Sequence, residues 1–546
     1  MEKDKIFIPL DTDFNKISIT EKEEIKKEGL LKAEVAEMPI FENLMQINIR
    51  QDDIFNNLLE EIEPIDFEYE TYGNDINILR DQITEASDSK YKARFQKNYE
   101  KFSLIISKKF VIIIQFLLSI AHEKGYGMGI SRGKFYFYNK RFWENRDYEF
   151  LYSFLGEFAQ KAGLDRLDAK QFKNKELLLK QFESDAMLPT FNDKPKDNLI
   201  PLQNCVLLVE NGEVELKSFK KEYYLKSLLP FKYDREAKAP IFINALNRIL
   251  PDPILQNILF EFFGSVFIKN LKHEKMLFLH GNGSNGKSLI HNVINAVFGE
   301  ENVTNHTLQS LCDADGQARA SIENTLINFS SEIGNGKFDI DTFKQLISNE
   351  PVYGKFLYKD KFRVTNYGRF AFNGNTLPSF VENTDAFYRR FIIIPFNVHI
   401  TDEEKDPYLS QKIISEELPG VFNLILEGMK RLLTQKGFSK SEIIDEEVKK
   451  YRRKSSSILS FLDDESYIKS TKTHMSSETF HVLYKDYCIK NGFHPFSTRA
   501  FNDQLRNMGF EIKRSTNGYY HINVEKSIPG IDDSSIVINI NRHINL

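Results

Sequence analysis

Residues 275–288 have the sequence KMLFLHGNGSNGKS, and Leu289 and Ile290 begin a further apolar run. The apolar half predicts a buried strand, and the glycine-rich half predicts a loop that leads into a helix. Glycine lets several backbone N–H groups turn toward one point, and the free N–H groups of a helix N-terminus attract an anion. The complete G-x-x-x-x-G-K-S spacing in this strand–helix context predicts a phosphate-binding loop for a nucleoside triphosphate.

Within this loop, Lys287 is expected to bring a positive charge to the outer phosphates, and the Ser288 hydroxyl is expected to bind Mg²⁺. A glycine-rich turn without a ligand is the alternative, and the complete spacing disfavours it. The residues expected to contact the nucleotide are Gly281, Asn282, Gly283, Ser284, Asn285, Gly286, Lys287 and Ser288.

The composition limits the class of protein. A chain of 546 residues is expected to form several domains, and its net charge of -5 gives no general attraction to nucleic acid. Any DNA contact must therefore come from local basic surfaces. The three cysteines are far apart, which predicts neither a zinc ribbon nor a disulfide framework and indicates a reducing, cytoplasmic compartment. The apolar run 110–121 is too short to cross a bilayer, so no membrane partner is expected.

The order of patterns along the chain predicts an α/β protein with five regions. Aromatic strands around Trp143 are expected to form core rather than to stack on bases. Strands then alternate with helices, as a parallel sheet requires, and the basic segment 449–457 is interpreted as a linker. The predicted regions are 1–95 (acidic, of unknown role), 96–235 (α+β), 236–448 (the phosphate-loop domain), 458–525 (a compact C-terminal unit) and 526–546 (a tail with an edge strand at 536–540).

Two further strands of the phosphate-loop domain end in polar side chains. Residues 325–332 have the sequence TLINFSSE, which predicts a second largely apolar strand that ends in Glu332, a carboxylate placed to polarise an attacking water beside the γ-phosphate. A glutamate that faces solvent at the strand end is the alternative. The strand 369–372 leads to Asn375, whose side chain can contact the γ-phosphate and the water. Arg389 and Arg390 precede one more apolar strand. They are either structural or reach the nucleotide of a neighbouring subunit, where they would stabilise transition-state charge.

The residues from Gly281 to Phe396 resemble the superfamily 3 helicases, specifically the phage and poxvirus primase–helicase group. The similar pieces, in order, are GNGSNGKS, the strand end at Ser331-Glu332, the segments 343–352 and 353–362, NTLP at 375–378, and YRRF at 388–391 with IPF at 394–396. Weaker similarity extends the resemblance to about residues 100–525, so that residues 96–235 resemble the helicase-associated N-terminal domain of that group. The resemblance implies an AAA+ core, a hexameric ring, ATP between subunits and DNA through the centre.

The resemblance also implies roles for individual residues. Lys287 and Ser288 would bind phosphate and Mg²⁺, Glu332 would activate water beside the metal, and Asn375 would sense the γ-phosphate. Of the two arginines, Arg390 fits the family pattern better as the finger that acts on a neighbouring subunit, and Arg389 is the second choice.

The DNA-gripping hairpin of the family corresponds to residues 355–363. Cations alternate there with aromatic residues, which suits single-stranded DNA because cations bind phosphates and aromatic rings meet bases. A solvated hairpin is the alternative. The expected DNA contacts are Lys355, Tyr358, Lys359 and Lys361.

Residues 458–525 look like a winged helix. Arg499, Asn502 and Arg506 have helical spacing, and residues 513–518 form a basic turn where a wing is expected. Domains of this kind bind DNA or proteins, and DNA contacts through Arg499 and Arg506 are favoured here.

Two features depart from the family pattern. Ser331 stands where many ring ATPases have an acid, so the second carboxylate near Mg²⁺ is either missing or supplied from elsewhere. The region before residue 96 is also shorter than a domain of ~100–200 residues, so a fused primase domain is not expected.

Together these features predict an ATP-dependent replicative DNA helicase, or replication initiator, of a phage, plasmid or integrated element in the bacterial cytoplasm. The expected partners are single-stranded and forked DNA, further copies in a homo-hexamer, and a primase and polymerase of the host or the element. The first alternative is a DNA-binding scaffold that recruits a host replisome and hydrolyses ATP poorly, which Ser331 would explain. The second is a P-loop kinase of small molecules, against which the basic hairpin and the paired arginines argue.

Overall fold

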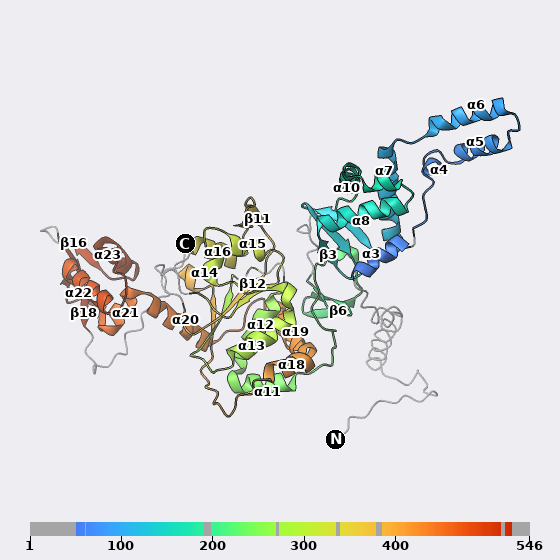
Figure 1. Cartoon of the computed structure of the whole chain (residues 1–546). Helices are drawn as coiled ribbons and strands as arrows, with labels where there is room; N and C mark the ends of the chain where they lie inside the picture. Colours follow the sequence, from blue (N-terminus) through green and yellow to red (C-terminus); the bar gives the residue numbers. More distant parts are fainter. Residues whose placement is uncertain are drawn as a thin grey trace, which may run out of the picture. The chain divides into compact units, whose positions relative to one another are not determined.

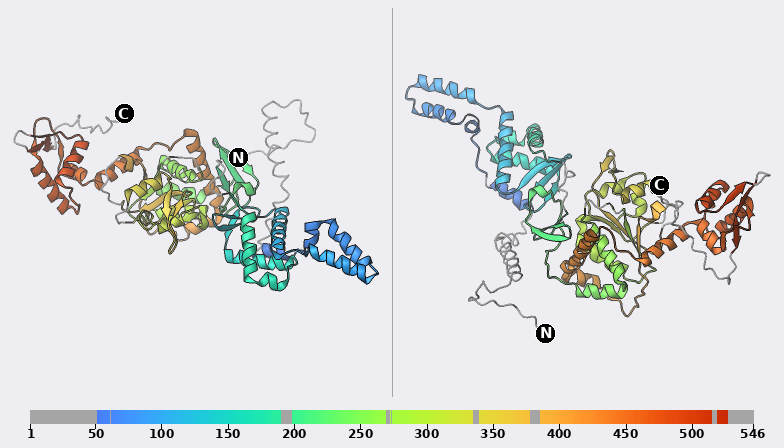
Figure 2. Two further views of the ribbon diagram at one scale, coloured as in Figure 1. Left: turned by 90° about the horizontal axis from the view of Figure 1, so that it is seen from above. Right: turned by 180° about the vertical axis from the view of Figure 1, so that it is seen from behind.

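The computed structural model describes residues 51–60, 62–189, 198–268, 272, 274–334, 339–377, 385–514 and 519–526. The chain divides into two compact units, Met1–Thr190 and Phe191–Leu546, and Figures 1 and 2 show their elements coloured along the sequence. The division differs from the boundaries predicted at 95/96 and 235/236. The predicted edge strand at 536–540 lies outside the described residues.

The first unit is built on a three-stranded antiparallel sheet with helices packed against it. The sheet has the order β1 (Gly127–Ser131), β2 (Lys134–Tyr138), β3 (Trp143–Arg146). Phe135, Phe137 and Trp143 are buried, so these aromatic residues form core, as predicted. Among residues 51–189 the helices are α3 (Gln51–Glu60), α4 (Phe67–Tyr72), α5 (Asn74–Glu85), α6 (Ser89–Tyr99), η2 (Glu100–Phe102), α7 (Ile106–Glu123), α8 (Tyr148–Lys161), α9 (Arg166–Lys170) and α10 (Phe172–Asp185).

Helix α3 explains why the first unit begins before residue 96. The ring of Phe55 lies 4.6 Å from that of Phe137 and 5.0 Å from that of Phe154, and Leu58 is buried in the same cluster. These apolar contacts remove α3 from water, and burial of this kind is the main favourable term in folding.

The second unit contains a five-stranded parallel sheet with the order β13-β7-β12-β9-β8. The pairing is in register: Gly374 of β12 lies opposite His280 of β7, and Phe372 of β12 lies opposite Ser330 of β9. The strands are β7 (Met276–His280), β8 (Val303–Thr304), β9 (Ile327–Ser330), β12 (Arg369–Gly374) and β13 (Phe391–Pro395). Because all five strands are parallel, their carboxyl ends meet at one edge of the sheet.

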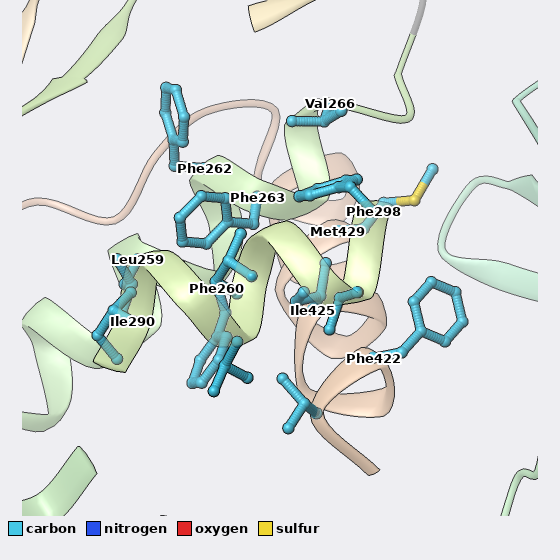
Figure 3. Packing of buried hydrophobic residues seen from close by; sticks show 14 of the residues in the cluster. Leu259, Phe260, Phe262, Phe263, Val266, Ile290, Phe298, Phe422, Ile425 and Met429 are labelled. Atoms are coloured by element: carbon cyan, nitrogen blue, oxygen red, sulfur yellow. The ribbon is translucent and has the colours of Figure 1, made fainter. Parts of the chain in front are cut away.

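Helices α12 and α19 form the centre of the hydrophobic core in the second unit (Figure 3). Their backbones approach closely at Gly428, where an added Cβ would lie 2.4 Å from the backbone of Phe260. A side chain there would therefore force the helices apart. The helices next to this core are α11 (Pro240–Ile249), α12 (Pro253–Ser265), α13 (Lys287–Phe298), α18 (Leu409–Glu416) and α19 (Leu418–Gln435).

A second small sheet belongs to the same core, although its residues were predicted to lie in the preceding domain. Ile200, Leu207 and Val209 are buried in one cluster with Phe263 and Leu277. This shared core explains why the chain divides near residue 190 rather than at 235/236. The strands are β4 (Leu199–Pro201), β5 (Val206–Glu210) and β6 (Glu213–Lys217), and β5 and β6 form a hairpin.

The basic segment 449–457 is not a linker, which corrects the sequence interpretation. Helix α20 (Glu442–Ser455) runs through it, and α21 (Ser457–Asp464) begins soon after. Tyr451 is buried and its ring lies 5.5 Å from that of Tyr388 and 5.3 Å from that of Phe391. Ile444 of the same helix is buried as well, so apolar contacts hold α20 although its sequence is rich in charges.

The last described residues have a core of their own, in which the rings of Tyr484 and Phe501 stack at 4.5 Å. The elements, coloured orange to red in Figures 1 and 2, are α21, α22 (Ser477–Lys490) and α23 (Thr498–Asn507) with two small antiparallel sheets. The sheets are β14 (Tyr467–Lys469) with β18 (Val524–Lys526), and β15 (Met475–Ser476) with β17 (Tyr520–Ile522) and β16 (Ile512–Arg514). A winged helix remains a prediction for this region.

Within the described part of the chain, no single helix has the length and apolar character needed to cross a membrane. One bent pair, Ser89–Phe102 with Ile106–Glu123, meets that test by length and composition when the two helices are taken together.

Candidate nucleotide site and basic hairpin

The predicted phosphate loop connects β7 to α13 at the carboxyl edge of the parallel sheet. Gly286 precedes the helix with φ +82°, a conformation that L side chains rarely adopt, and an added Cβ would lie 2.6 Å from Ile249. Both constraints require glycine at this position. The loop thus leads directly into the N-terminus of α13, and backbone N–H groups at such a terminus can bind an anion.

Lys287, the first residue of α13, is 8% exposed. Its ammonium donates to the carbonyl of Gly281 at 2.6 Å and to the side-chain oxygens of Asn285 at 3.0 Å and Asn375 at 3.4 Å. Burial lowers the pKa of Lys287 from its usual value, and the surrounding oxygens compensate part of the lost hydration. A cation held in this way is well placed to bind phosphate oxygens.

The loop is fixed to the ends of the neighbouring strands. Asn285 donates to the carbonyl of Phe396 at 3.0 Å, and the N–H of Gly281 donates to the carbonyl of Gly374 at 3.2 Å. The N–H of Ile400 donates to the carbonyl of Ser284 at 2.8 Å. The loop therefore keeps its shape through contacts with residues that follow β12 and β13.

The strand order brings the three predicted polar positions to one edge. Asn375 follows β12, which lies between the strand of the loop, β7, and β9, whose end leads to Glu332. Ser288, Glu332 and Asn375 are all exposed there. The structure thus brings Lys287 and Asn375 into contact and leaves Glu332 accessible at the same edge of the sheet.

These residues fit a triphosphate with Mg²⁺. Mg²⁺ keeps several waters and takes one or two protein oxygens in addition to substrate phosphates, so Ser288 and Glu332 are a sufficient protein contribution. No group of three or more His, Cys, Asp or Glu side chains that could hold a metal occurs among the described residues. Ser331, which is also exposed, adds a hydroxyl where a second carboxylate would add charge.

The two arginines lie at the opposite edge of the sheet from the loop. They precede β13, whose first residue, Phe391, pairs with Met276 at the start of β7. A five-residue strand is about 16 Å long, so the loop at the far end of β7 lies beyond the reach of either side chain.

Arg390 and Arg389 differ in their exposure. The side chain of Arg390 is 8% exposed and contacts Glu274 at 3.0 Å and the hydroxyl of Ser348 at 3.1 Å. The side chain of Arg389 is 63% exposed and contacts Glu274 at 3.1 Å. The preferred sequence candidate, Arg390, is therefore held inside its own subunit, and Arg389 is the accessible one.

The predicted DNA hairpin is a real two-stranded hairpin, β10 (Val352–Gly354) with β11 (Phe362–Val364). The cations Lys355, Lys359, Lys361 and Arg363 are all exposed. Tyr358 is 95% exposed at the tip and has φ +60°, a strained conformation for a bulky residue. The hairpin thus presents positive charge and several aromatic rings to solvent, since Tyr353 is 63% and Phe356 43% exposed beside Tyr358.

A buried arginine supports this hairpin, and the sequence analysis missed it. Arg319, in α15 (Gln317–Ser321), is 7% exposed and donates to the carbonyl of Tyr353 in β10 at 2.8 Å. It also donates to the carbonyls of Leu311 at 2.7 Å and Asp313 at 2.6 Å. A single arginine between alanines gives no sequence signal, because its three acceptors are backbone carbonyls, which any residue type can supply.

In the C-terminal region, the three residues predicted to share one face of α23 differ in burial. Asn502 is buried and accepts a hydrogen bond from Ser477 at 2.8 Å, so it is structural. Arg499 and Arg506 are exposed, and Arg506 pairs with Asp503 at 2.8 Å. Both arginines remain predicted DNA contacts.

Two family models match the chain. Residues 118–251 match the family described as D5 N terminal like, and residues 279–390 match DUF5906, described as a family of unknown function. Both are typical of phage and viral primase–helicase proteins. The second match contains the phosphate loop, Glu332, Asn375 and both arginines. No curated protein matches the chain.

Solved structures of the NrS-1 C-terminal region are similar to the chain at low identity. The A-form apo structure is 15% identical, with a TM-score of 0.43, and the match covers 76% of this chain and 100% of that one. A second apo structure is 15% identical, with a TM-score of 0.37, and the match covers 60% of this chain and 96% of that one. TM-scores as low as these support no argument about fold or function.

Proposed function

We propose that the protein is an ATP-dependent DNA helicase that serves the replication of a phage, plasmid or integrated element. The observation that carries the proposal is the contact between Lys287 and Asn375, beside the end of the strand that leads to Glu332. This is the arrangement that ATP hydrolysis needs: a cation for phosphate, a polar sensor and a carboxylate for water. The family matches support a role of the phage primase–helicase kind.

In this proposal, ATP with Mg²⁺ supplies the phosphoryl group whose transfer to water releases free energy. Lys287 binds the outer phosphate oxygens, and the Ser288 hydroxyl contacts the metal. Glu332 accepts a proton from the attacking water, and Asn375 orients the γ-phosphate by a hydrogen bond. Positioning of this kind is most of what phosphoryl transfer requires from a protein.

An arginine of a neighbouring subunit completes the site. Because both arginines lie a full strand length from the loop of their own chain, a guanidinium can reach a nucleotide only in another copy. Arg389 suits this role better than Arg390, since its side chain is exposed whereas Arg390 is buried. This requirement for a second copy supports a ring that binds ATP between its subunits. We propose that the ring is a homo-hexamer of AAA+ subunits.

The basic hairpin then grips single-stranded DNA within that ring. Lys355, Lys359 and Lys361 would bind phosphates and Tyr358 would meet a base, while hydrolysis moves the hairpin along the strand. We further propose that residues 236–448 are the ATPase domain, that residues 96–235 contain the helicase-associated domain, and that residues 458–525 form a winged helix that contacts DNA through Arg499 and Arg506. A primase and polymerase of the host or the element would act with this helicase.

Ser331 favours a second candidate, a DNA-binding scaffold that hydrolyses ATP slowly and recruits a host replisome. Strand displacement measured beside ATPase activity separates the two. The helicase predicts that ATP turnover separates the strands of a forked duplex. The scaffold predicts DNA binding with little turnover and no strand separation. A kinase of small molecules would be a monomer whose turnover DNA does not stimulate.

A further inference from the structure

Helix α6, in the first unit, has a strongly basic sequence within an acidic chain. Its 11 residues, SKYKARFQKNY, include Lys90, Lys92, Arg94 and Lys97 and contain no acidic residue. The chain as a whole has a net charge of -5. Positive charge is therefore concentrated here against the overall balance.

Most of these cations lie along one side of the helix. Lys90, Arg94 and Lys97 have the spacing i, i+4, i+7, which places them on one face, and Lys101 in η2 continues the spacing at i+11. From Lys90 to Lys101 this row, which we call the basic row, is about 16 Å long at the rise of an α-helix. Lys92 lies on the opposite side of α6 by the same geometry.

The basic row is exposed, and Lys101 donates only a local hydrogen bond, to the side-chain oxygen of Asn98 at 3.3 Å. Lys90, Arg94, Lys97 and Lys101 are all exposed, and none of them forms an ion pair within the described part of the chain. None of the residues of α6 is buried. Four neighbouring cations without an ion pair to an acidic side chain produce a local positive potential at the surface of the helix.

A different cation holds this part of the unit together. Arg80 of α5 donates to Asp66 at 2.9 Å, to Glu68 at 3.4 Å and to the hydroxyl of Tyr99 at the end of α6 at 3.4 Å. The hydrogen bond from Arg80 lowers the pKa of Asp66 to about 2. Arg80 is therefore structural, whereas Lys90, Arg94 and Lys97 can be changed without loss of such contacts.

Helices α5 and α6 lie side by side as an antiparallel pair in Figures 1 and 2. Ile76 of α5 is completely buried, and the rings of Tyr72 and Phe102 pack edge to face at 4.9 Å. The hydrogen bond from Arg80 to Tyr99, the last residue of α6, joins the two helices directly. An isolated helix of this length would be marginal in water, so this contact helps to keep the basic row on a helix.

We propose that the basic row binds the phosphate backbone of nucleic acid, as a contact separate from the basic hairpin. A straight row of exposed cations is complementary to the regular negative charge of a phosphate backbone, and each cation bound there releases condensed counterions. Contacts of this kind position a protein on nucleic acid without selecting a sequence. The first unit would thus hold DNA independently of nucleotide binding in the second unit.

The test uses the full chain without nucleotide. Lys90→Ala, Arg94→Ala and Lys97→Ala are combined in a chain that also carries Lys359→Ala and Lys361→Ala, which weakens the proposed hairpin contact. The oligonucleotides are fluorescent, of mixed sequence, and either single-stranded or duplex. Their binding is measured between about 50 and 200 mM salt, a range in which the affinity of phosphate contacts falls steeply. We expect weaker binding and a slope of log K against log salt that falls by about two on single strands and by about three on duplex.

The matched control removes the same charge from elsewhere in the first unit. Lys161→Ala, Lys170→Ala and Lys173→Ala change three exposed lysines of α8, α9 and α10. An equal loss of binding in this control would overturn the proposal, because general charge would then explain the effect. Far-ultraviolet circular dichroism checks that both variants remain folded, and the single variant Lys92→Ala, on the opposite side of α6, should bind like the parent.

Two other outcomes would also overturn the proposal. The first is an unchanged salt slope in the variant. The second is that the variant loses binding to vesicles containing anionic lipid but binds DNA like its parent. Failure of the proposed helicase function is read separately, from ATP-dependent strand separation by the unmodified chain.

Discussion

The ammonium of Lys287 lies 3.4 Å from the side-chain oxygen of Asn375, which connects the phosphate loop to the end of the neighbouring strand β12. The two residues are 88 positions apart in the sequence. The contact exists because β12 lies directly beside β7, so that the carboxyl ends of both strands meet. The side chain of Asn375 is therefore placed beside the cation that we propose to bind the outer phosphates, which is the position that its proposed role as γ-phosphate sensor requires.

The ATP site predicts different effects for two substitutions. Lys287→Ala should weaken nucleotide binding and abolish turnover, because it removes the buried cation from the loop. Glu332→Gln should keep ATP bound and slow hydrolysis by about 10²–10⁴-fold, the usual contribution of a general base. Binding of a fluorescent ATP analogue and phosphate release measure the two effects. Hydrolysis at the normal rate by Glu332→Gln would remove the water-activating role.

The basic hairpin predicts a salt-dependent DNA contact. Lys359→Ala with Lys361→Ala should weaken binding of single-stranded DNA and reduce the slope of log K against log salt by about 1.4, because two fewer phosphates are neutralised. Lys412→Ala with Lys440→Ala is the matched control, since both lysines are exposed in the same unit and lie outside the hairpin. If the two double variants show the same slope, the hairpin does not lie on the DNA path.

Arg319 should matter for DNA binding although it is buried. Arg319→Ala leaves the carbonyls of Leu311, Asp313 and Tyr353 without this donor, and each buried unsatisfied group costs about 1–3 kcal/mol. We expect a loosened hairpin, seen as faster proteolysis between residues 355 and 361 and weaker binding of single-stranded DNA. Proteolysis at the parent rate would show that other contacts hold the hairpin.

The arginine pair predicts a clear division of roles. Arg389→Ala should reduce ATPase activity strongly with little change in thermal stability, because its side chain is exposed; fingers of this kind are worth on the order of 10³–10⁵ in rate in GTPases. Arg390→Ala should lower the melting temperature, because it leaves Glu274 and Ser348 without a buried partner. Phosphate release and thermal unfolding distinguish the two variants.

Mixing of subunits tests whether Arg389 acts on another copy. Arg389→Ala and Lys287→Ala chains should each be inactive alone. Mixed assemblies should recover part of the ATPase activity at interfaces that pair an intact Lys287 with an intact Arg389. If mixing is demonstrated by a labelled subunit and no activity returns, the trans assignment is wrong.

The sequence predicts the phosphate loop and the polar strand ends because each depends on a local pattern. The alternation of apolar runs and turns is enough to place β7, β9 and β12 along the chain. Periodicity does not say which strands are neighbours, so the contact between Lys287 and Asn375 appears only in the sheet. The same limit hides Arg319, whose acceptors are backbone carbonyls of residues 8, 6 and 34 positions away.

Burial explains the differences at the arginines and at the boundaries. Arg389 and Arg390 are adjacent and alike in sequence, but one faces solvent and the other contacts Ser348 in the interior. The predicted boundaries follow changes in composition, whereas the structural division follows shared cores, which join α3 to the first unit and β4–β6 to the second. Local patterns carry little information about such distant partners.

The most direct test of the account is the separation of a forked DNA duplex by the full chain with ATP and Mg²⁺, measured beside particle size with and without ATP. We predict strand separation by a ring-sized particle, and loss of that separation in the Glu332→Gln variant while DNA binding remains. ATP hydrolysis and DNA binding without any strand separation, or turnover by a monomer that DNA does not stimulate, would contradict a helicase.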